Sequence, residues 1–126
     1  MATSILIADD HDDNRELLQL LLRGAGYEVS EARDGHECLQ FAREQHPDVI
    51  LVDLSMPGMD GWTVFRELQT KPETRTIPCI AVTAHAGLHR RQALDAGFRA
   101  YVTKPFRSDD LLEIIASVLA KRAATP

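Results

Sequence analysis

Cysteines and long apolar runs are both scarce in this sequence of 126 residues. The two cysteines, Cys38 and Cys79, form no CxxC pair, so we interpret them as small reduced hydrophobic residues rather than as a disulfide or a metal site. No apolar run approaches the roughly 18 residues that a membrane span requires. The start "MATSILIADD" lacks the basic segment of a signal peptide. We therefore expect a cytoplasmic protein that does not bind membranes.

An excess of basic residues is also absent, because 14 Lys and Arg stand against 19 Asp and Glu and the formal net charge is −5. Binding of nucleic acid through its phosphates needs a concentrated basic surface, so this balance argues against it. A small basic cluster at His89, Arg90 and Arg91 could steer an acidic protein partner. The 44% hydrophobic and 26% charged residues are typical of a globular domain, and the length predicts a single domain over 1–126.

Apolar runs alternate with amphipathic stretches along the whole chain. Each run of β-branched and aliphatic residues is followed by leucines or other apolar residues at helical spacing. Strict alternation of strands and helices implies a parallel sheet with helices on both faces, a doubly wound α/β fold. We expect Asp34 and Ser108 to cap the second and last helices. The expected strands are 4–8, 27–32, 48–53, 77–84 and 99–103; the expected helices are 14–26, 35–46, 62–69, 88–97 and 108–122, with a frayed tail over 122–126.

Polar side chains follow four of the expected strands where each strand ends. Asp9 and Asp10 follow the first, Asp53 ends the third, Thr83 ends the fourth and Lys104 follows the fifth. The carboxyl ends of parallel strands meet at one edge of a sheet, where such folds bind ligands. Three carboxylates that meet there repel one another, and a divalent cation with oxygen ligands, such as Mg²⁺, relieves the repulsion.

A site with Mg²⁺, a lysine and a hydroxyl has the groups that stabilise a phosphoryl group during transfer. An ionised carboxylate among them can act as the nucleophile and form an aspartyl phosphate. Asp53 stands alone at the end of the apolar run "VILV", so it is the candidate phosphoacceptor.

Four motifs at these strand ends resemble those of the response-regulator receiver domain, the phosphoacceptor module of two-component signalling. They are "ADD", "DLSMPGMDG", "VTA" and "YVTKPF", in this order along the chain. The resemblance covers almost the whole sequence and implies the flavodoxin-like strand order 2-1-3-4-5. It also implies a cis peptide bond before Pro105. The resemblance further implies that Asp10 binds the metal directly and Asp9 binds it through water. Asp53 and the backbone carbonyl of Ser55 would be the other ligands, and Mn²⁺ could substitute for Mg²⁺.

The resemblance also assigns the phosphoryl group its contacts. Lys104 would pair with it, and the backbone N–H groups of Ser55 and Ala84 would bind it. Thr83 would move to donate a hydrogen bond to it, and Tyr101 would be the switch aromatic that turns inward when Thr83 moves.

Partners and lifetime follow from the same resemblance. A histidine kinase or histidine phosphotransfer protein would donate the phosphoryl group. The surface of the fourth helix, fifth strand and fifth helix, with Arg90, Arg91 and Tyr101, would contact a downstream protein, and the chain would be a monomer or a weak phosphorylation-dependent dimer. Ser55 and His85 would adjust the rate of phosphoryl hydrolysis.

Several residues and functions keep alternative interpretations. Asp12 and Asp13 suit the first turn of a helix because its dipole favours negative charge there. The pair His85 and His89 has a spacing that could bind a transition metal, although such pairs usually face solvent. A phosphatase of the haloacid-dehalogenase kind needs an acid where Ser55 stands. A flavodoxin-like cofactor binder needs a hydroxyl-rich or glycine-rich phosphate loop after the first strand, where "ADDHDDN" presents carboxylates instead. A pseudo-receiver scaffold is disfavoured because every chemical position of the family is filled.

Overall fold

Five strands alternate with five helices in the computed structural model, which describes residues 2–84 and 89–124. The strands are β1 (Ser4–Ala8), β2 (Glu28–Ala32), β3 (Val49–Asp53), β4 (Cys79–Thr83) and β5 (Ala100–Thr103). The helices are α1 (Asp12–Gly24), α2 (Gly35–Gln45), α3 (Gly61–Gln69), α4 (Arg90–Ala96) and α5 (Ser108–Ala124). Every expected element is therefore present within a few residues of its expected bounds.

All five strands are parallel and lie in the order β2-β1-β3-β4-β5. This order confirms the doubly wound, flavodoxin-like fold. The sheet places β1 beside β3 and β3 beside β4, so the ends of these three strands are neighbours. The register pairs Ala8 with Val52 and Asp53 with Val82, which brings the residues after β1 beside the end of β3.

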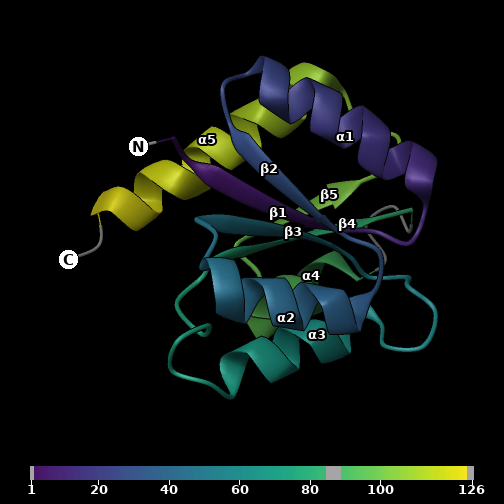
Figure 1. The fold of residues 1–126 in the computed structure, drawn as a ribbon, viewed down its shortest axis with the longest axis vertical. Helices are drawn as coiled ribbons and strands as arrows, with labels where there is room; N and C mark the ends of the chain where they lie inside the picture. Colours follow the sequence, from purple (N-terminus) through teal and green to yellow (C-terminus); the bar gives the residue numbers. More distant parts are fainter. Residues whose placement is uncertain (1, 85–88, 125–126) are drawn as a thin grey trace.

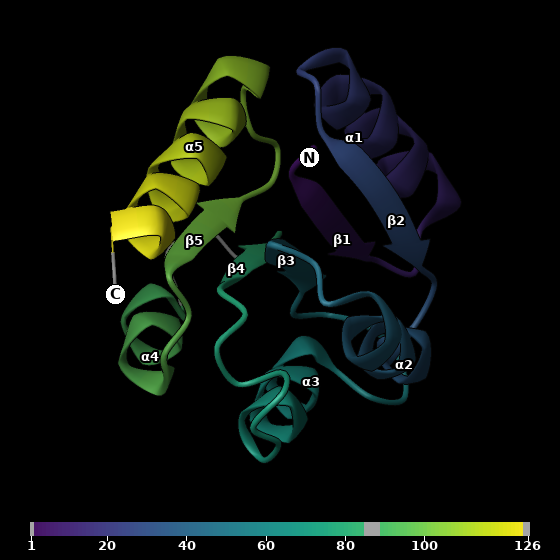
Figure 2. The same ribbon diagram turned by 60° about the vertical axis from the view of Figure 1, so that its left-hand side comes forward.

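Helices cover both faces of the sheet (Figure 1, Figure 2). Ile5 and Ile7 of β1 point to the face that α1 and α5 cover, where they meet the buried leucines of α1 and Leu111 and Ile115 of α5. Leu6 of β1 points to the opposite face, which α2, α3 and α4 cover. Because strand side chains alternate between faces, a strand buried on both sides reads as a continuous apolar run. This explains why the strands stand out in the sequence.

Helix ends agree with the sequence in one case and differ in two. The Asp34 side chain accepts a hydrogen bond from the Glu37 N–H, as expected for the cap of α2. The expected cap of α5 is wrong by one position, because Ser108 is already the first residue of the helix and the Leu111 N–H donates to the Arg107 carbonyl. The helix also continues to Ala124, so the tail expected over 122–126 is helical for its first three residues, two of them alanines with high helix propensity.

The two cysteines are free and buried, which agrees with their interpretation as hydrophobic residues. Burial raises the pKa of the Cys38 thiol to about 12, so it does not form a reactive thiolate at neutral pH. Within the residues that the structure describes, no helix has the length and apolar character to cross a membrane.

Candidate functional site

Three carboxylates from two strand ends meet at one edge of the sheet. Asp9 and Asp10 follow β1, and Asp53 is the last residue of β3. Carboxylate oxygens of all three, together with a nitrogen of His11, lie within 4.8 Å of one another. Asp9 and Asp53 are only 2% and 4% exposed, so water screens their charges poorly. The convergence that the parallel sheet predicts is therefore present.

Lys104, just after β5, bridges two of these carboxylates. Its Nζ atom lies 3.0 Å from Asp9 Oδ2 and 3.0 Å from Asp53 Oδ2. Partial burial opposes the charged form, but the hydrogen bonds to Asp53 and Asp9 outweigh it and raise the pKa of Lys104 above its ordinary value. The ammonium is therefore charged at neutral pH, and its contribution to these ion pairs is lost when the pH rises through the raised pKa of Lys104.

The second oxygen of each carboxylate has a different environment. Asp53 Oδ1 accepts a hydrogen bond from the Ser55 N–H over 2.8 Å, and Asp9 Oδ1 accepts one from the His11 N–H over 2.8 Å. Asp10 Oδ1 is buried and has no hydrogen-bond partner among the described residues. A buried oxygen without a donor is costly. Because the carboxylates outnumber the one ammonium and offer this oxygen, the donor set fits a divalent cation such as Mg²⁺.

The loop after Asp53 depends on two glycines. Gly58 has φ +77°, which a residue with a Cβ atom rarely adopts, so it permits the turn that follows Pro57. Gly61 begins α3 directly behind the end of β3, where a Cβ atom would lie 2.6 Å from the Asp53 carbonyl oxygen. Asp60 caps α3 by accepting a hydrogen bond from the Thr63 N–H. The motif "PGMDG" therefore forms a tight turn that brings the start of α3 against the end of β3 at Asp53.

Thr83 and its neighbours complete the edge. Thr83 ends β4 in the register position beside Thr103, and its carbonyl accepts a 2.7 Å hydrogen bond from the Lys104 N–H. Ala84 follows as an exposed residue. The peptide bond before Pro105 is cis, as expected. His85 lies outside the described residues. The possible metal pair of His85 and His89 therefore lies outside them as well.

Comparison with known families decides between the interpretations. The model of the response regulator receiver domain matches residues 5–116. The chain belongs to the response regulator receiver family. The receiver domain is 38% identical over 120 residues to the polar-differentiation response regulator DivK of Brucella ovis, covering 94% of this chain and 98% of DivK. It is 44% identical over 113 residues to the response regulator PleD of Caulobacter vibrioides, covering 89% of this chain but only 24% of PleD.

Solved structures agree with this assignment. The receiver domain of the sensor histidine kinase PA1611 from Pseudomonas aeruginosa, which holds a magnesium ion in its active site cleft, is 32% identical with a TM-score of 0.87. The alignment covers 95% of this chain and 99% of that one. A CheY-like receiver domain from Methanospirillum hungatei is 28% identical with a TM-score of 0.91, and each chain is covered completely. The phosphatase, flavodoxin-like and scaffold alternatives are not favoured.

Two residues near the site in this receiver domain were not expected from the sequence. His11 directs its Nδ1 atom toward Asp9 and Asp10. Arg15, which is buried, donates from Nη1 to the Asp9 carbonyl over 2.7 Å and also pairs with Asp12. The spacing of Arg15, Leu18 and Leu22 on one helix face was a signal that Arg15 turns inward.

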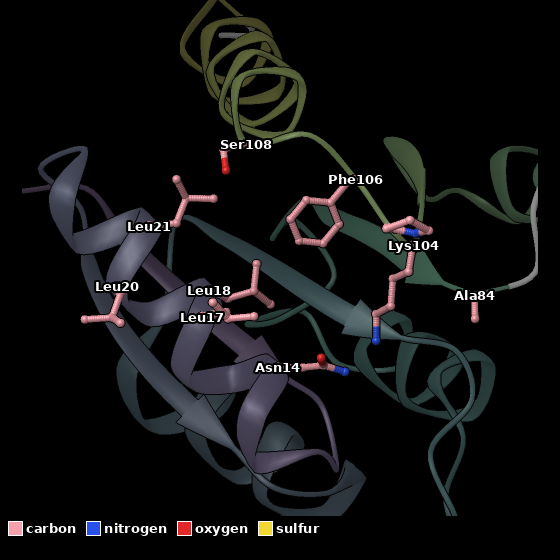
Figure 3. A pocket seen from close by; sticks show the side chains of 10 residues that line it. Asn14, Leu17, Leu18, Leu20, Leu21, Ala84, Lys104, Phe106 and Ser108 are labelled. Atoms are coloured by element: carbon pink, nitrogen blue, oxygen red, sulfur yellow. The ribbon is translucent and has the colours of Figure 1, made fainter.

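An apolar groove of about 820 Å³ runs from the site of the receiver domain along α1. Figure 3 shows leucines of α1 on one side, Phe106 on the other, and Lys104 with Ala84 at one end. Leu17 and Leu20 are 67% and 66% exposed, although leucine side chains favour burial. The groove thus joins an exposed apolar surface to the ammonium group that binds Asp53.

The expected contact surface of α4, β5 and α5 carries exposed charged side chains, and the Tyr101 ring is not among its exposed groups. Arg91 is exposed and pairs with Asp95 of its own helix over 3.6 Å. Tyr101 is buried, and Arg90 donates to its carbonyl oxygen over 3.5 Å. The ring of Tyr101 therefore belongs to the core between the sheet and α2, α3 and α4 rather than to the exposed surface.

Proposed function

We propose that Asp53 of this response regulator accepts a phosphoryl group from a phosphohistidine in a Mg²⁺-dependent reaction. The observation that carries the proposal is the Asp53 carboxylate, which is held by Lys104 on one oxygen and by the Ser55 N–H on the other. An Asp53 oxygen attacks phosphorus while the P–N bond to histidine breaks, and the bonding electron pair stays on the imidazole nitrogen. Asp9, Asp10 and Asp53 would hold Mg²⁺, which supplies charge neutralisation for the phosphoryl oxygens.

Two hydrogen-bond donors of the chain already contact the Asp53 carboxylate. The Lys104 ammonium and the Ser55 N–H contact Asp53 before phosphorylation, so they need little rearrangement to bind phosphoryl oxygens. The Ala84 N–H is the expected further donor. Thr83 is completely buried next to this edge, and its hydroxyl is the proposed group that responds to phosphorylation, with Tyr101 as the side chain that follows it. Adjustment of the lifetime by Ser55 and His85 stays a prediction.

Phosphorylation with a small donor tests this proposal. Incubation with acetyl phosphate and Mg²⁺ is expected to add one phosphate to the intact mass, and hydroxylamine should remove it because acyl phosphates are labile to this nucleophile. Neither the Asp53→Asn variant nor wild type with EDTA should gain mass. A phosphate on the Asp53→Asn variant would contradict the assignment of the phosphoacceptor.

We further propose that the phosphodonor protein docks on the α1 groove, because the groove is apolar, exposed and continuous with Lys104. Leu17→Glu is expected to slow transfer from a histidine phosphotransfer protein about tenfold, since a charged residue in an apolar contact loses on the order of 1.4 kcal/mol or more. Phosphorylation by acetyl phosphate should not change. The same proposal includes a downstream protein that binds at α4, β5 and α5, and action in the cytoplasm. It also includes a chain that is a monomer or a weak phosphorylation-dependent dimer.

A matched control lies on α4, where Leu94 is 39% exposed. Leu94→Glu should leave transfer from the phosphotransfer protein unchanged. If Leu94→Glu slowed the transfer and Leu17→Glu did not, the donor would dock on α4 instead of on α1.

A further inference from the structure

His11 adds a nitrogen donor to the carboxylates of the site. Its Nδ1 atom lies 3.3 Å from Asp9 Oδ1 and 3.3 Å from Asp10 Oδ1, although 64% of the side chain is exposed. The imidazole is therefore turned toward the acidic edge rather than only toward solvent. His11 follows the motif "ADD" directly, so the chain places a nitrogen donor next to the two carboxylates of that motif.

The backbone holds His11 in this position. His11 precedes α1 with an extended conformation, φ −96° and ψ 118°, and its N–H donates to Asp9 Oδ1. Its side chain makes no capping hydrogen bond to the helix. Residue 11 is therefore fixed beside the carboxylates, while its ring is not used to cap α1.

The spacing of the donors suits one cation. Ligand atoms about 2.1 Å from an octahedral metal lie roughly 3.0 Å apart when adjacent and roughly 4.2 Å apart when opposite. The four candidate atoms, one each from Asp9, Asp10, His11 and Asp53, all lie within 4.8 Å of one another. Small side-chain rotations would bring all four around a single ion, and Asp10 Oδ1 makes no hydrogen bond to the described residues that this movement would break.

The type of donor atom determines which cation the site binds more tightly. Mg²⁺ prefers oxygen ligands and keeps several waters, whereas imidazole nitrogen favours later first-row metals such as Ni²⁺ and Zn²⁺. We propose that His11 Nδ1 is a ligand of the divalent cation at this site and gives the site a preference for these metals over Mg²⁺. The inference rests on the proposed cation site of Asp9, Asp10 and Asp53. The ring must carry its proton on Nε2, so that the Nδ1 lone pair binds the metal.

Pulsed electron paramagnetic resonance of bound Mn²⁺ tests ligation directly. Nitrogen modulation is expected in wild type and should disappear in His11→Phe, which keeps an aromatic ring without a donor. His36→Phe is the matched control, because His36 is an exposed histidine of α2 outside the donor group. Wild-type Mn²⁺ without nitrogen modulation would overturn the inference and leave the carboxylate site intact.

Calorimetric titration tests selectivity. His11→Phe is expected to lower Ni²⁺ affinity by at least about tenfold and to change Mg²⁺ affinity by less than about threefold, while His36→Phe changes neither. Equal losses for Ni²⁺ and Mg²⁺, or no loss for Ni²⁺, would overturn the nitrogen ligand. Failure of wild type to bind any of these cations would instead overturn the underlying cation site, and the inference with it.

Discussion

Replacing Lys104 with methionine is expected to strengthen Mg²⁺ binding and, at the same time, to slow the phosphorylation of Asp53. The Lys104 ammonium lies 3.0 Å from both Asp9 and Asp53, so it competes with a cation for the same carboxylates. Removing one positive charge at this distance should raise Mg²⁺ affinity by about tenfold or more. The same change removes the proposed donor to the transferring phosphoryl group, and loss of such a donor typically costs roughly 10²–10³ in rate.

The two effects are measured separately. Titration calorimetry gives Mg²⁺ affinity, and the rate of mass gain with acetyl phosphate at saturating Mg²⁺ gives the transfer step. Lys71→Met is the control, because Lys71 is exposed in the segment after α3 and is expected to leave both values unchanged. Weaker Mg²⁺ binding in Lys104→Met would show that the lysine organises the carboxylates rather than competing with the cation.

Gly61→Ala is expected to lower the free energy of unfolding by about 1–3 kcal/mol or more, the usual cost of overpacking a tight site. A Cβ atom at this position would lie 2.6 Å from the Asp53 carbonyl oxygen and 2.8 Å from the Leu54 Cα atom. Both are backbone atoms, so the conflict cannot be relieved by a side-chain rotation. Urea denaturation followed by Trp62 fluorescence measures the change, since Trp62 is the next residue.

Gly24→Ala provides the matched control. Gly24 ends α1, and a Cβ atom there would meet nothing within 4 Å. The same substitution should therefore be neutral or stabilising by up to about 1 kcal/mol, because alanine favours the helix and reduces the freedom of the unfolded chain. If the two variants unfolded at the same urea concentration, the close approach of α3 to β3 would be wrong.

The fold and the centre of the site were largely predictable because both depend on simple patterns. Continuous apolar runs such as Ile5–Ala8 can be strands only if both sheet faces are covered. Once the sheet is parallel, its topology brings Asp9, Asp53 and Lys104 to one edge, whatever the loops between them do. The strand order itself came only from family resemblance, since no local pattern distinguishes one order of parallel strands from another.

What was not predictable depends on side-chain direction and on contacts distant in sequence. Sequence spacing does not show that His11 turns its ring toward Asp9 and Asp10, because a loop residue can face either way. The α1 groove combines leucines of the first helix with Phe106, so no single segment signals it. The Tyr101 ring is buried by packing from other elements, which periodicity in a four-residue strand does not reveal.

The bridge made by Lys104 has a consequence for the order in which the protein is built. Lys104 is 95 residues from Asp9 and 51 residues from Asp53 along the chain. During synthesis, the acidic residues emerge long before the lysine that pairs with them, and closing loops of this length costs conformational entropy. The ammonium group reaches the acidic edge only when β5 lies beside β4, so docking of β5 completes both the sheet and the Lys104 bridge.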